Sequence, residues 1–277
     1  MIQGKDIKFR THNFGDLMGS VTKQELTPKQ QEELKDLLSK IQLTEKQAQT
    51  RDKLVYKRDS EPELDATAKT HVQEIFRRVV RNTHKHNFEN KHTKKGNLVE
   101  DSAINRIAKV NGWGVFLNAN KLGIELKDSI GVGHPDAFKE GVLGFDAKAS
   151  YSDDTFPLFQ SELKERNYIW QDKRLAMMAG LDCWYTCYSL ENSPEEIVIQ
   201  DAWRLWKQAK EEGELTESFI DDVRALHTYD HLADWERVKT YKVELSSEDI
   251  KLIKKRAEMA RNYFDELVEQ YKFLKPN

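Results

Sequence analysis

Cysteine is scarce in this sequence, and long hydrophobic runs are missing. The 277 residues include only Cys183 and Cys187. Two thiolates cannot provide the four ligands of a structural zinc or iron–sulfur site, so centres of that kind are excluded. Residues 1–20 lack the apolar stretch of a signal peptide, and no run of about 18 apolar residues could span a membrane. We therefore expect a cytoplasmic protein that has no membrane partner.

The sequence also lacks a strong excess of charge of one sign. Its net charge is −3 although 33% of its residues are charged. Any binding to nucleic acid must therefore come from local basic patches. The mean hydropathy of −0.76 combined with 10% aromatic residues is typical of amphipathic helices with wide solvated faces rather than of disorder.

The N-terminal third is predicted to be helical. Thr27 and Pro28 are suited to the cap and first position of a helix that ends near Lys40, and a similar Thr-containing segment begins at Leu43. Two such copies predict a helical hairpin rather than a repeat array. A further apolar stripe predicts a helix over 64–80. We assign residues 1–95 to a helical N-terminal extension.

A basic segment closes this extension. Between Arg81 and Lys95 five lysines and arginines are opposed by Glu89 alone, and three histidines are interspersed. The segment is either a solvated connector or a loop that contacts phosphates, for which Lys91, Lys94 and Lys95 are the candidates. We consider a metal site built from its histidines the weaker interpretation.

The central region predicts a mixed α/β (α+β) fold in residues 96–200. Gly96 and Asn97 open a helix that ends at Gly112, and Gly180 ends a second helix that begins near Ser161. The expected strands are 113–117, the hairpin strands 128–138 and 142–149, and two more over 181–189 and 197–199. Residues 201–277 form a helical C-terminal extension that packs on this core or on a second subunit, with a last helix from Ser246 or Ser247 to about Phe273.

Polar residues concentrate on the hairpin. The period of two along a strand places Asp146 and Lys148 on one face and Phe145 on the other, and Asp136 is expected opposite on the first hairpin strand. The natural occupant of such a carboxylate cluster is a hard divalent cation with oxygen ligands. The simpler alternative is a salt bridge on a solvated strand face.

These motifs resemble the PD-(D/E)XK nuclease superfamily. The segments that carry the resemblance are Gly96-Asn97-Leu98-Val99-Glu100, Pro135-Asp136, Asp146-Ala147-Lys148 and Tyr168-Ile169-Trp170-Gln171. Their order and spacing are similar to the branch that contains lambda exonuclease and the YqaJ-like viral recombinases, over about residues 96–190. Two positions depart from that pattern, since Ala137 replaces the usual Gly and Asp146 stands where Glu is more frequent.

The resemblance implies a restriction-endonuclease-like core, in which a central mixed sheet is flanked by helices, and a set of residue roles. Glu100, Asp136, Asp146 and the carbonyl of Ala147 would bind Mg²⁺, or Mn²⁺ in its place. Lys148 would orient the attacking water, and a bound cation would lower its pKa. Gln171 and Tyr168 would hold the phosphate or position the nucleophile. The catalytic set is therefore Glu100, Asp136, Asp146, Lys148 and Gln171.

Further basic residues flank the second helix of the core. Lys164, Arg166, Lys173 and Arg174 are predicted to line a DNA groove together with Tyr168 and the basic segment. Five tryptophans are candidates for stacking on unpaired bases, although core packing is the better interpretation for most of them: Trp170, Trp184, Trp203, Trp206 and Trp235.

The resemblance implies a metal-dependent DNA nuclease, an exonuclease that resects duplex ends in phage-type recombination. It also implies 5′-to-3′ digestion and a single-strand annealing partner, is compatible with a ring-shaped homo-oligomer, and would place a phage-encoded protein in the host cytoplasm. One alternative is an endonuclease of restriction or repair type. Another is a non-catalytic DNA-binding or assembly protein, and a third is a helical scaffold whose match is fortuitous.

Overall fold

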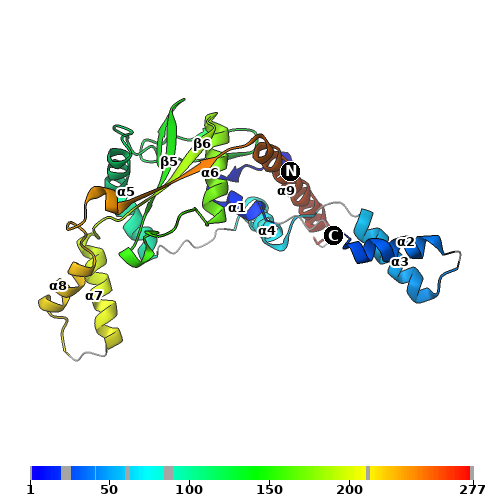
Figure 1. The fold of residues 1–277 in the computed structure, drawn as a ribbon, viewed down its shortest axis with the longest axis horizontal. Coiled ribbons are helices and arrows are strands. Elements are labelled where there is room, and N and C mark those ends of the chain that lie inside the picture. The colour runs from blue at the N-terminus through cyan, green and yellow to red at the C-terminus, as the bar shows by residue number, and fades with distance from the viewer. Residues whose placement is uncertain are drawn as a thin grey trace. The chain divides into compact units, whose positions relative to one another are not determined.

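The computed structural model describes residues 2–19, 26–40, 42–59, 63–83, 90–209 and 213–274. The chain divides into two compact units (Figure 1). The first unit comprises Met1–Asp6, Asp16–Thr83 and Lys255–Asn277, and the second comprises Ile7–Gly15 and His84–Lys254. No helix within these described ranges has both the length and the apolarity needed to cross a membrane.

The first unit is helical, as the N-terminal sequence predicts. It contains the 3₁₀ turn η1 (Gly4–Asp6) and helices α2 (Pro28–Ser39), α3 (Glu45–Asp59) and α4 (Ala66–Val80), together with residues 255–273 of α9 (Ser247–Phe273). The Thr27 side chain caps α2 in a capping box with Gln30, and Pro28 is the first helical residue. Leu34, Leu37 and Leu54 form a small core between α2 and α3, which confirms the predicted helical hairpin.

The second unit is built on a four-stranded mixed sheet in the order β4-β5-β6-β7. Its strands are β4 (Ala137–Lys139), β5 (Leu143–Ala149), β6 (Cys183–Ser189) and β7 (Val238–Glu244). The β5–β6 pair is parallel and the two outer pairs are antiparallel. The predicted hairpin is therefore β4–β5, with Gly141 at φ 68° in its turn.

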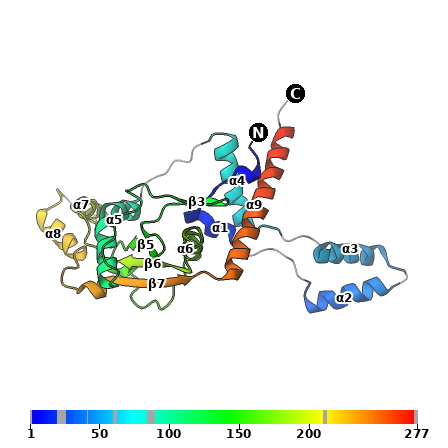
Figure 2. The same ribbon diagram turned by 90° about the horizontal axis from the view of Figure 1, so that it is seen from above.

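Two helices cover opposite faces of this sheet, α5 (Lys91–Val110) and α6 (Arg166–Ala179) (Figure 2). Ile104 and Ile107 of α5 pack on Phe145 of β5, whereas Leu175 of α6 packs on Trp184 of β6. The alternation along the strands thus buries apolar side chains on both faces. A mixed sheet flanked by helices confirms the expected fold class.

A second, three-stranded sheet combines a strand from the start of the second unit with two strands from its middle. It is formed by β1 (Phe9–Arg10), β2 (Leu126–Lys127) and β3 (Gly131–Gly133), with β1 parallel to β3. The turns η2 (Thr11–Asn13) and α1 (Phe14–Leu17) follow β1. Residues 128–138 are therefore not one hairpin strand, because their first half pairs in this sheet and their second half pairs with β5.

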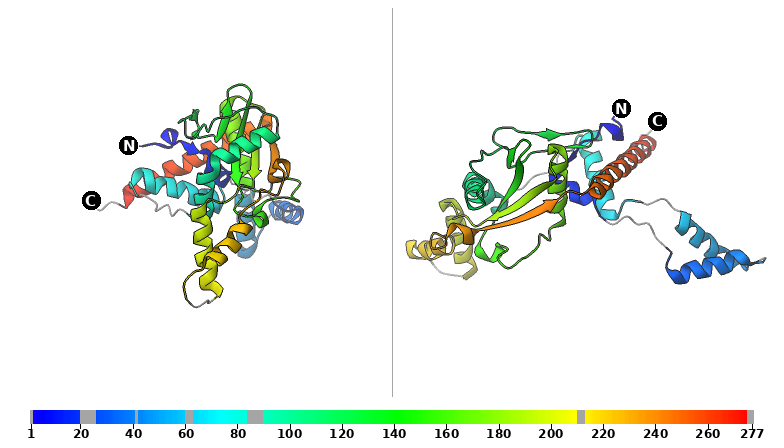
Figure 3. Two further views of the ribbon diagram at one scale, coloured as in Figure 1. Left: turned by 90° about the vertical axis from the view of Figure 1, so that its left-hand side faces the viewer. Right: turned by 45° about the horizontal axis from the view of Figure 1, so that its top comes forward.

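The C-terminal part of the second unit contains η3 (Asp153–Thr155), α7 (Glu195–Ala209), α8 (Glu217–Leu226) and η4 (Asp234–Arg237). Strand β7 lies beside β6 as the last strand of the sheet (Figure 3). Residues 201–277 are expected to form a helical extension. Strand β7 lies within this range, so that expectation is wrong for residues 238–244. In the structure 201–254 belong to the same unit as the sheet.

Four further expectations differ from the structure. Helix α5 begins at Lys91 rather than at Gly96, so 91–95 are helical, and residues 84–89 of the predicted basic loop lie outside the described ranges. Residues 113–117 form no strand, 197–199 lie inside α7, and α6 begins at Arg166 rather than near Ser161. The predicted last helix coincides with α9.

Candidate active site

A pocket of about 500 Å³ lies where α5, β5 and α6 meet in the second unit. Its walls include five residues that the sequence analysis assigns to the site: Glu100, Asp136, Ala147, Lys148 and Tyr168. Asp146 and Gln171 are buried and bonded to one another. The structure therefore brings together the residues of four separate sequence motifs.

Asp146 is the most enclosed carboxylate of the group and has no exposed surface. Its Oδ2 atom accepts hydrogen bonds from the Gln171 side-chain amide and from Lys148 Nζ, the latter at 3.3 Å. Its Oδ1 atom is buried and has no hydrogen-bond partner in the structure. A buried carboxylate oxygen without a partner is costly unless a ligand satisfies it.

Asp136 lies directly before β4, and the register of β4 with β5 continues to place it opposite Asp146. Its Oδ2 atom accepts a hydrogen bond of 2.9 Å from the backbone N–H of Ala147. Burial and the neighbouring carboxylate of Asp146 raise the pKa of Asp136 to about 7. Asp136 in the pocket wall and the buried Asp146 beside it repel one another when both are ionised, and such a pair of carboxylates favours a cation.

Lys148 shares the strand face of Asp146, as the period of two predicts. Burial opposes its charged form, but the carboxylates of Asp146 and Asp136 outweigh burial and hold the pKa of Lys148 above its ordinary value. The predicted lowering depends on a bound cation and stays a prediction. The ammonium nitrogen also lies 4.7 Å from the centre of the Tyr168 ring, so α6 contributes a cation–π contact.

Glu100 reaches the pocket from the third turn of α5. Its Oε2 atom accepts a hydrogen bond of 2.6 Å from the Asn118 side-chain amide, which also donates to Asp101 at 2.9 Å. The sequence analysis does not name Asn118. It lies just beyond a segment interpreted as a strand, and no local pattern connects it with Glu100.

Asp172 is a second residue that sequence reasoning missed. It is fully buried on α6, and Thr186 Oγ1 donates a hydrogen bond of 2.5 Å to its Oδ2 atom. Burial and the charge of Asp146 raise the pKa of Asp172 well above its ordinary value. The sequence does contain one signal for Asp172. It lies three residues before Leu175 and four before Ala176, so an acid falls on the apolar face of the helix.

Solved structures of two other proteins are similar in fold to this chain. The structure of a phage-related exonuclease from Haemophilus somnus 129PT matches with a TM-score of 0.63 over 96% of both chains, at 18% sequence identity. This chain shares the fold of that structure. An alkaline exonuclease, LHK-Exo, from Laribacter hongkongensis matches with a TM-score of 0.54 at 10% identity, over 96% of this chain and 91% of that chain. LHK-Exo in complex with dAMP matches with a TM-score of 0.50 at 11% identity, over 94% of each chain.

No protein-family model and no curated protein matches the sequence. The likeness to these structures therefore confirms the expected resemblance at the level of the fold.

The side chains around the pocket include oxygen donors of the kind that divalent metal ions bind. Within the described ranges no three His, Cys, Asp or Glu side chains converge into a ready-made metal site. Asp136 and Asp146 nevertheless present two carboxylates, one of which has a buried oxygen without a partner, and Glu100 lines the same pocket. Hard oxygen donors of this kind fit Mg²⁺ or Mn²⁺.

The basic residues predicted to contact DNA fall into three groups in the structure. Lys95 and Arg174 are fully buried, so the expectation that they line a DNA groove is wrong. Lys91, Lys94 and Lys173 form ion pairs with Asp201, Glu196 and Asp249 at 3.6, 2.8 and 2.6 Å. Lys164 and Arg166 are exposed near the start of α6.

The two buried cations, Lys95 and Arg174, form hydrogen bonds within the protein. Lys95 Nζ donates a hydrogen bond of 2.8 Å to the backbone carbonyl of Tyr151, and burial lowers its pKa to about 8. The guanidinium of Arg174 donates to both carboxylate oxygens of Asp128 at 3.0 and 3.1 Å. This bidentate pairing provides acceptors for the two terminal nitrogens of the buried guanidinium, whereas its Nε has no hydrogen-bond partner in the structure.

Of the tryptophans, Trp184 is confirmed as a core residue with no exposed surface. Trp206 packs on Phe219, and the Trp170 ring is covered by Lys173 Nζ at 4.8 Å. Trp203 and Trp235 are 46% and 72% exposed, so these two keep a free surface for stacking.

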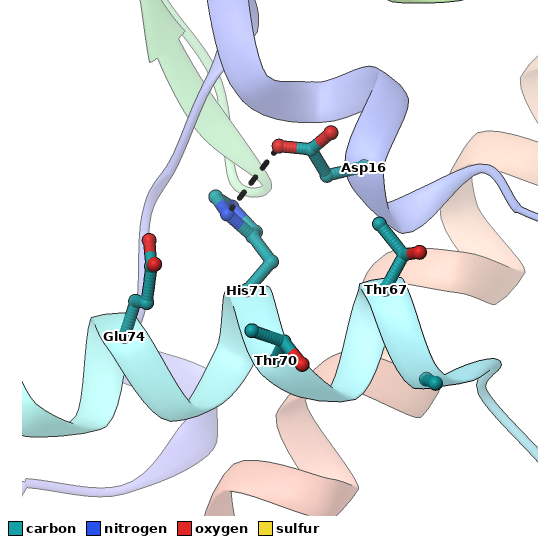
Figure 4. A pocket seen from close by; sticks show the side chains of 6 residues that line it. Asp16, Thr67, Thr70, His71 and Glu74 are labelled. Carbon is teal, nitrogen blue, oxygen red and sulfur yellow. Dashed lines mark ion pairs between the residues drawn. The ribbon is translucent and has the colours of Figure 1, made fainter.

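The first unit contains a different polar pocket of about 340 Å³, lined by Asp16, Ala66, Thr67, Thr70, His71 and Glu74 (Figure 4). His71 Nδ1 lies 3.8 Å from Asp16 Oδ2, beyond hydrogen-bond distance. No lysine or arginine lines this pocket. It therefore lacks the combination of carboxylates and cation found beside β5.

Proposed function

We propose that this protein is a metal-dependent deoxyribonuclease that hydrolyses phosphodiester bonds, and that it acts as an exonuclease on the ends of duplex DNA. The observation that carries the proposal is the Asp146 cluster. One buried carboxylate is bonded to Lys148 and Gln171 and faces Asp136 across the strand pair, beside a pocket that Glu100 also lines. The likeness to structures of two exonucleases supports the same class of reaction.

The chemistry of phosphodiester hydrolysis requires stabilisation of negative charge on the phosphoryl oxygens and a deprotonated water. A divalent metal ion supplies both when it is bound. Asp136, Asp146 and the carbonyl of Ala147 would hold it, and Glu100 would do so directly or through water. Glu100 is already oriented by its hydrogen bond from Asn118.

Lys148 acts next to these carboxylates as a fixed positive charge. Its ammonium is held by Asp146 and by the Tyr168 ring, and it lines the pocket. From this position it orients the attacking water and stabilises charge that develops on the phosphate. The Gln171 side-chain amide holds the Asp146 carboxylate in its orientation, so Gln171 is a positioning residue.

The alternative of a non-catalytic DNA-binding protein would not require this arrangement. A decayed site would be expected to have lost a carboxylate or the lysine, whereas all four signature groups are present. The alternative of an endonuclease uses the same cluster and must be separated by experiment. Polarity, a ring-shaped oligomer and an annealing partner stay predictions from the resemblance.

The test measures Mg²⁺-dependent degradation of linear duplex DNA labelled at the 5′ or the 3′ end, beside covalently closed circles. Lys148→Ala is compared with Lys242→Ala, a matched change of a half-exposed lysine that pairs with Glu244 on β7. Release of nucleotides from linear DNA alone, lost only in Lys148→Ala, supports an exonuclease. Cutting of circles indicates an endonuclease, and no cleavage by folded wild-type protein with Mg²⁺ or Mn²⁺ contradicts the proposal.

A further inference from the structure

The pocket beside β5 extends beyond the carboxylates toward the start of α5. Its walls at that end include His92, Thr93 and Gly96 of α5 and Ser150, which directly follows β5. Gly96 precedes Glu100 by four residues, which corresponds to about 6 Å along the helix axis. This end of the pocket therefore lies about one helical turn from the proposed reaction centre.

Gly96 is an unusual residue for its position. It is the sixth residue of the 20-residue helix α5, where glycine is less favourable than alanine. Its φ is not in the left-handed region, and outside the helix's own backbone no atom of the described residues lies within 4 Å of the place a Cβ would take. Neither backbone strain nor packing against the described part of the chain explains the glycine. Because Gly96 lines the pocket, the bare backbone there gives a ligand room to approach closely.

Ser150 provides an independent observation at the same end. The residue is 5% exposed, and its backbone N–H is bonded to the carbonyl of Ser189 at 2.9 Å. Its side-chain hydroxyl is buried and has no hydrogen-bond partner in the structure. A buried hydroxyl in a pocket wall that makes no hydrogen bond within the protein is ready to donate one to a ligand.

The chemistry of this end favours an anion. The first turn of α5 lines the pocket, and the N-terminus of a helix of this length carries a partial positive charge. Lys91 and Lys94 are already paired with Asp201 and Glu196, and the His92 ring packs against the Tyr151 ring in a tilted arrangement with a centroid distance of 4.7 Å. The groups that remain for a ligand are hydroxyls and the end of the helix, which suit a phosphate better than a metal ion.

We propose that this end of the pocket is a second phosphate subsite. The backbone of the substrate strand lies against Gly96, and the Ser150 hydroxyl donates a hydrogen bond to a phosphate that flanks the scissile one. The inference rests on the proposed nuclease function for the identity of its ligand. It assigns to Gly96 and Ser150 a role in binding rather than in the chemical step.

The test measures binding in EDTA, so that no hydrolysis occurs, with fluorescence anisotropy of a labelled 5′-phosphorylated duplex oligonucleotide. Gly96→Ala places a methyl group in the pocket and Ser150→Ala removes the hydroxyl. Ser150→Ala is expected to raise the Kd about tenfold, the size of effect typical of one hydrogen bond to a charged group. Gly96→Ala is expected to raise the Kd because its methyl group keeps the substrate strand from approaching the helix backbone. Asn105→Ala on the exposed side of α5 is the matched control and should leave the Kd unchanged.

Thermal unfolding separates this role from a structural one. Gly96→Ala should keep or raise the Tm, because alanine is the better helix former, while it weakens binding. A methylphosphonate at the flanking position of the oligonucleotide should weaken binding to wild type and should weaken it less in Ser150→Ala.

The results distinguish the two proposals. If Lys148→Ala abolishes degradation while both pocket variants bind DNA like Asn105→Ala, the subsite is refuted and the nuclease proposal stands. If the variants weaken binding in a protein that degrades no DNA, the subsite is supported and the nuclease proposal fails. Wild-type protein that binds no oligonucleotide overturns the subsite.

Discussion

Gln171 of α6 donates a hydrogen bond to the same carboxylate oxygen of Asp146 that accepts one from Lys148. Residues from a helix and from the strand beneath it thus fix one buried carboxylate. The other oxygen of that carboxylate has no partner in the structure. The relationship explains why the Tyr-x-x-Gln motif belongs to the site although Gln171 does not line the pocket, and it leads to specific expectations.

Removal of the Gln171 side-chain amide should lower the catalytic rate while the protein still folds. Gln171→Leu frees Asp146 to rotate, and misplacement of a catalytic group by about 1 Å can lower the rate about 100-fold. We expect kcat on linear duplex DNA to fall between about 10- and 100-fold. The exposed Gln200 of α7 gives the matched control Gln200→Leu. Equal activity of the two variants would refute a positioning role for Gln171.

The raised pKa of Asp136 predicts a pH-dependent stability of the metal-free protein. Because its folded pKa of about 7 exceeds the ordinary value of 3.8, the folded state retains a proton that the unfolded state releases between these values. Stability should therefore fall as the pH rises from about 4 to 7, by up to about 1.4 kcal/mol per pH unit for one group. Urea unfolding in EDTA from pH 5 to 8 measures this slope.

Asp136→Asn should reduce that slope, and Mg²⁺ should counteract it in wild type. A cation binds the deprotonated carboxylate, so the rise in Tm on addition of Mg²⁺ should be larger at pH 8 than at pH 6. A Tm rise that is the same at both values, or the same in Asp136→Asn, would argue against a metal at Asp136.

Asp172 should affect stability rather than the pocket itself. Its raised pKa means that ionisation of the buried acid is unfavourable and that its cost grows as the pH rises. Asp172→Asn retains an acceptor for Thr186 and removes the ionisation, so the variant should be more stable than wild type at pH 8 and similar to it at pH 5. Urea midpoints at the two values test this, and a variant that is equally destabilised at both would contradict it.

The Arg174–Asp128 pair should contribute strongly to the stability of the second unit. Asp128→Ala leaves a fully buried guanidinium without its carboxylate and also removes the acceptor for the N–H groups of Ile130 and Gly131. Loss of one partner of a buried pair costs about 3–5 kcal/mol. Glu140→Ala, at an exposed turn position, should change the free energy of unfolding by about 0.5 kcal/mol or less. Similar losses in the two variants would show that the pair contributes little.

The sequence predicted the parts of the fold that depend on short-range patterns. The Thr27-Pro28 cap, the Lys139-Glu140-Gly141 turn and the alternation at Asp146 and Lys148 are local signals, and each is found in the structure. The short apolar run 197–199 was misinterpreted because a run of this length fits a strand as well as a buried helix face. Strand β7 was missed because lysines and a threonine interrupt its apolar residues.

The tertiary partners of charged residues had no local signal. Lys95 and Arg174 were assigned to a DNA groove because of their charge, whereas contacts with Tyr151 and Asp128, 56 and 46 residues away, bury them. Asn118 was overlooked for the same reason, since its bond to Glu100 joins an irregular segment to α5. Motif spacing therefore located the cluster, and the structure was needed to identify the residues that orient it.

The central claim is that Asp146 anchors a phosphodiesterase site, and one measurement tests it most directly. Mg²⁺-dependent release of nucleotides from end-labelled linear duplex DNA is compared between wild type, Asp146→Asn and Lys242→Ala, at equal concentrations of folded protein. The account predicts release by wild type and Lys242→Ala, and a loss of at least about 100-fold in Asp146→Asn. Release by Asp146→Asn at the wild-type rate would contradict the account.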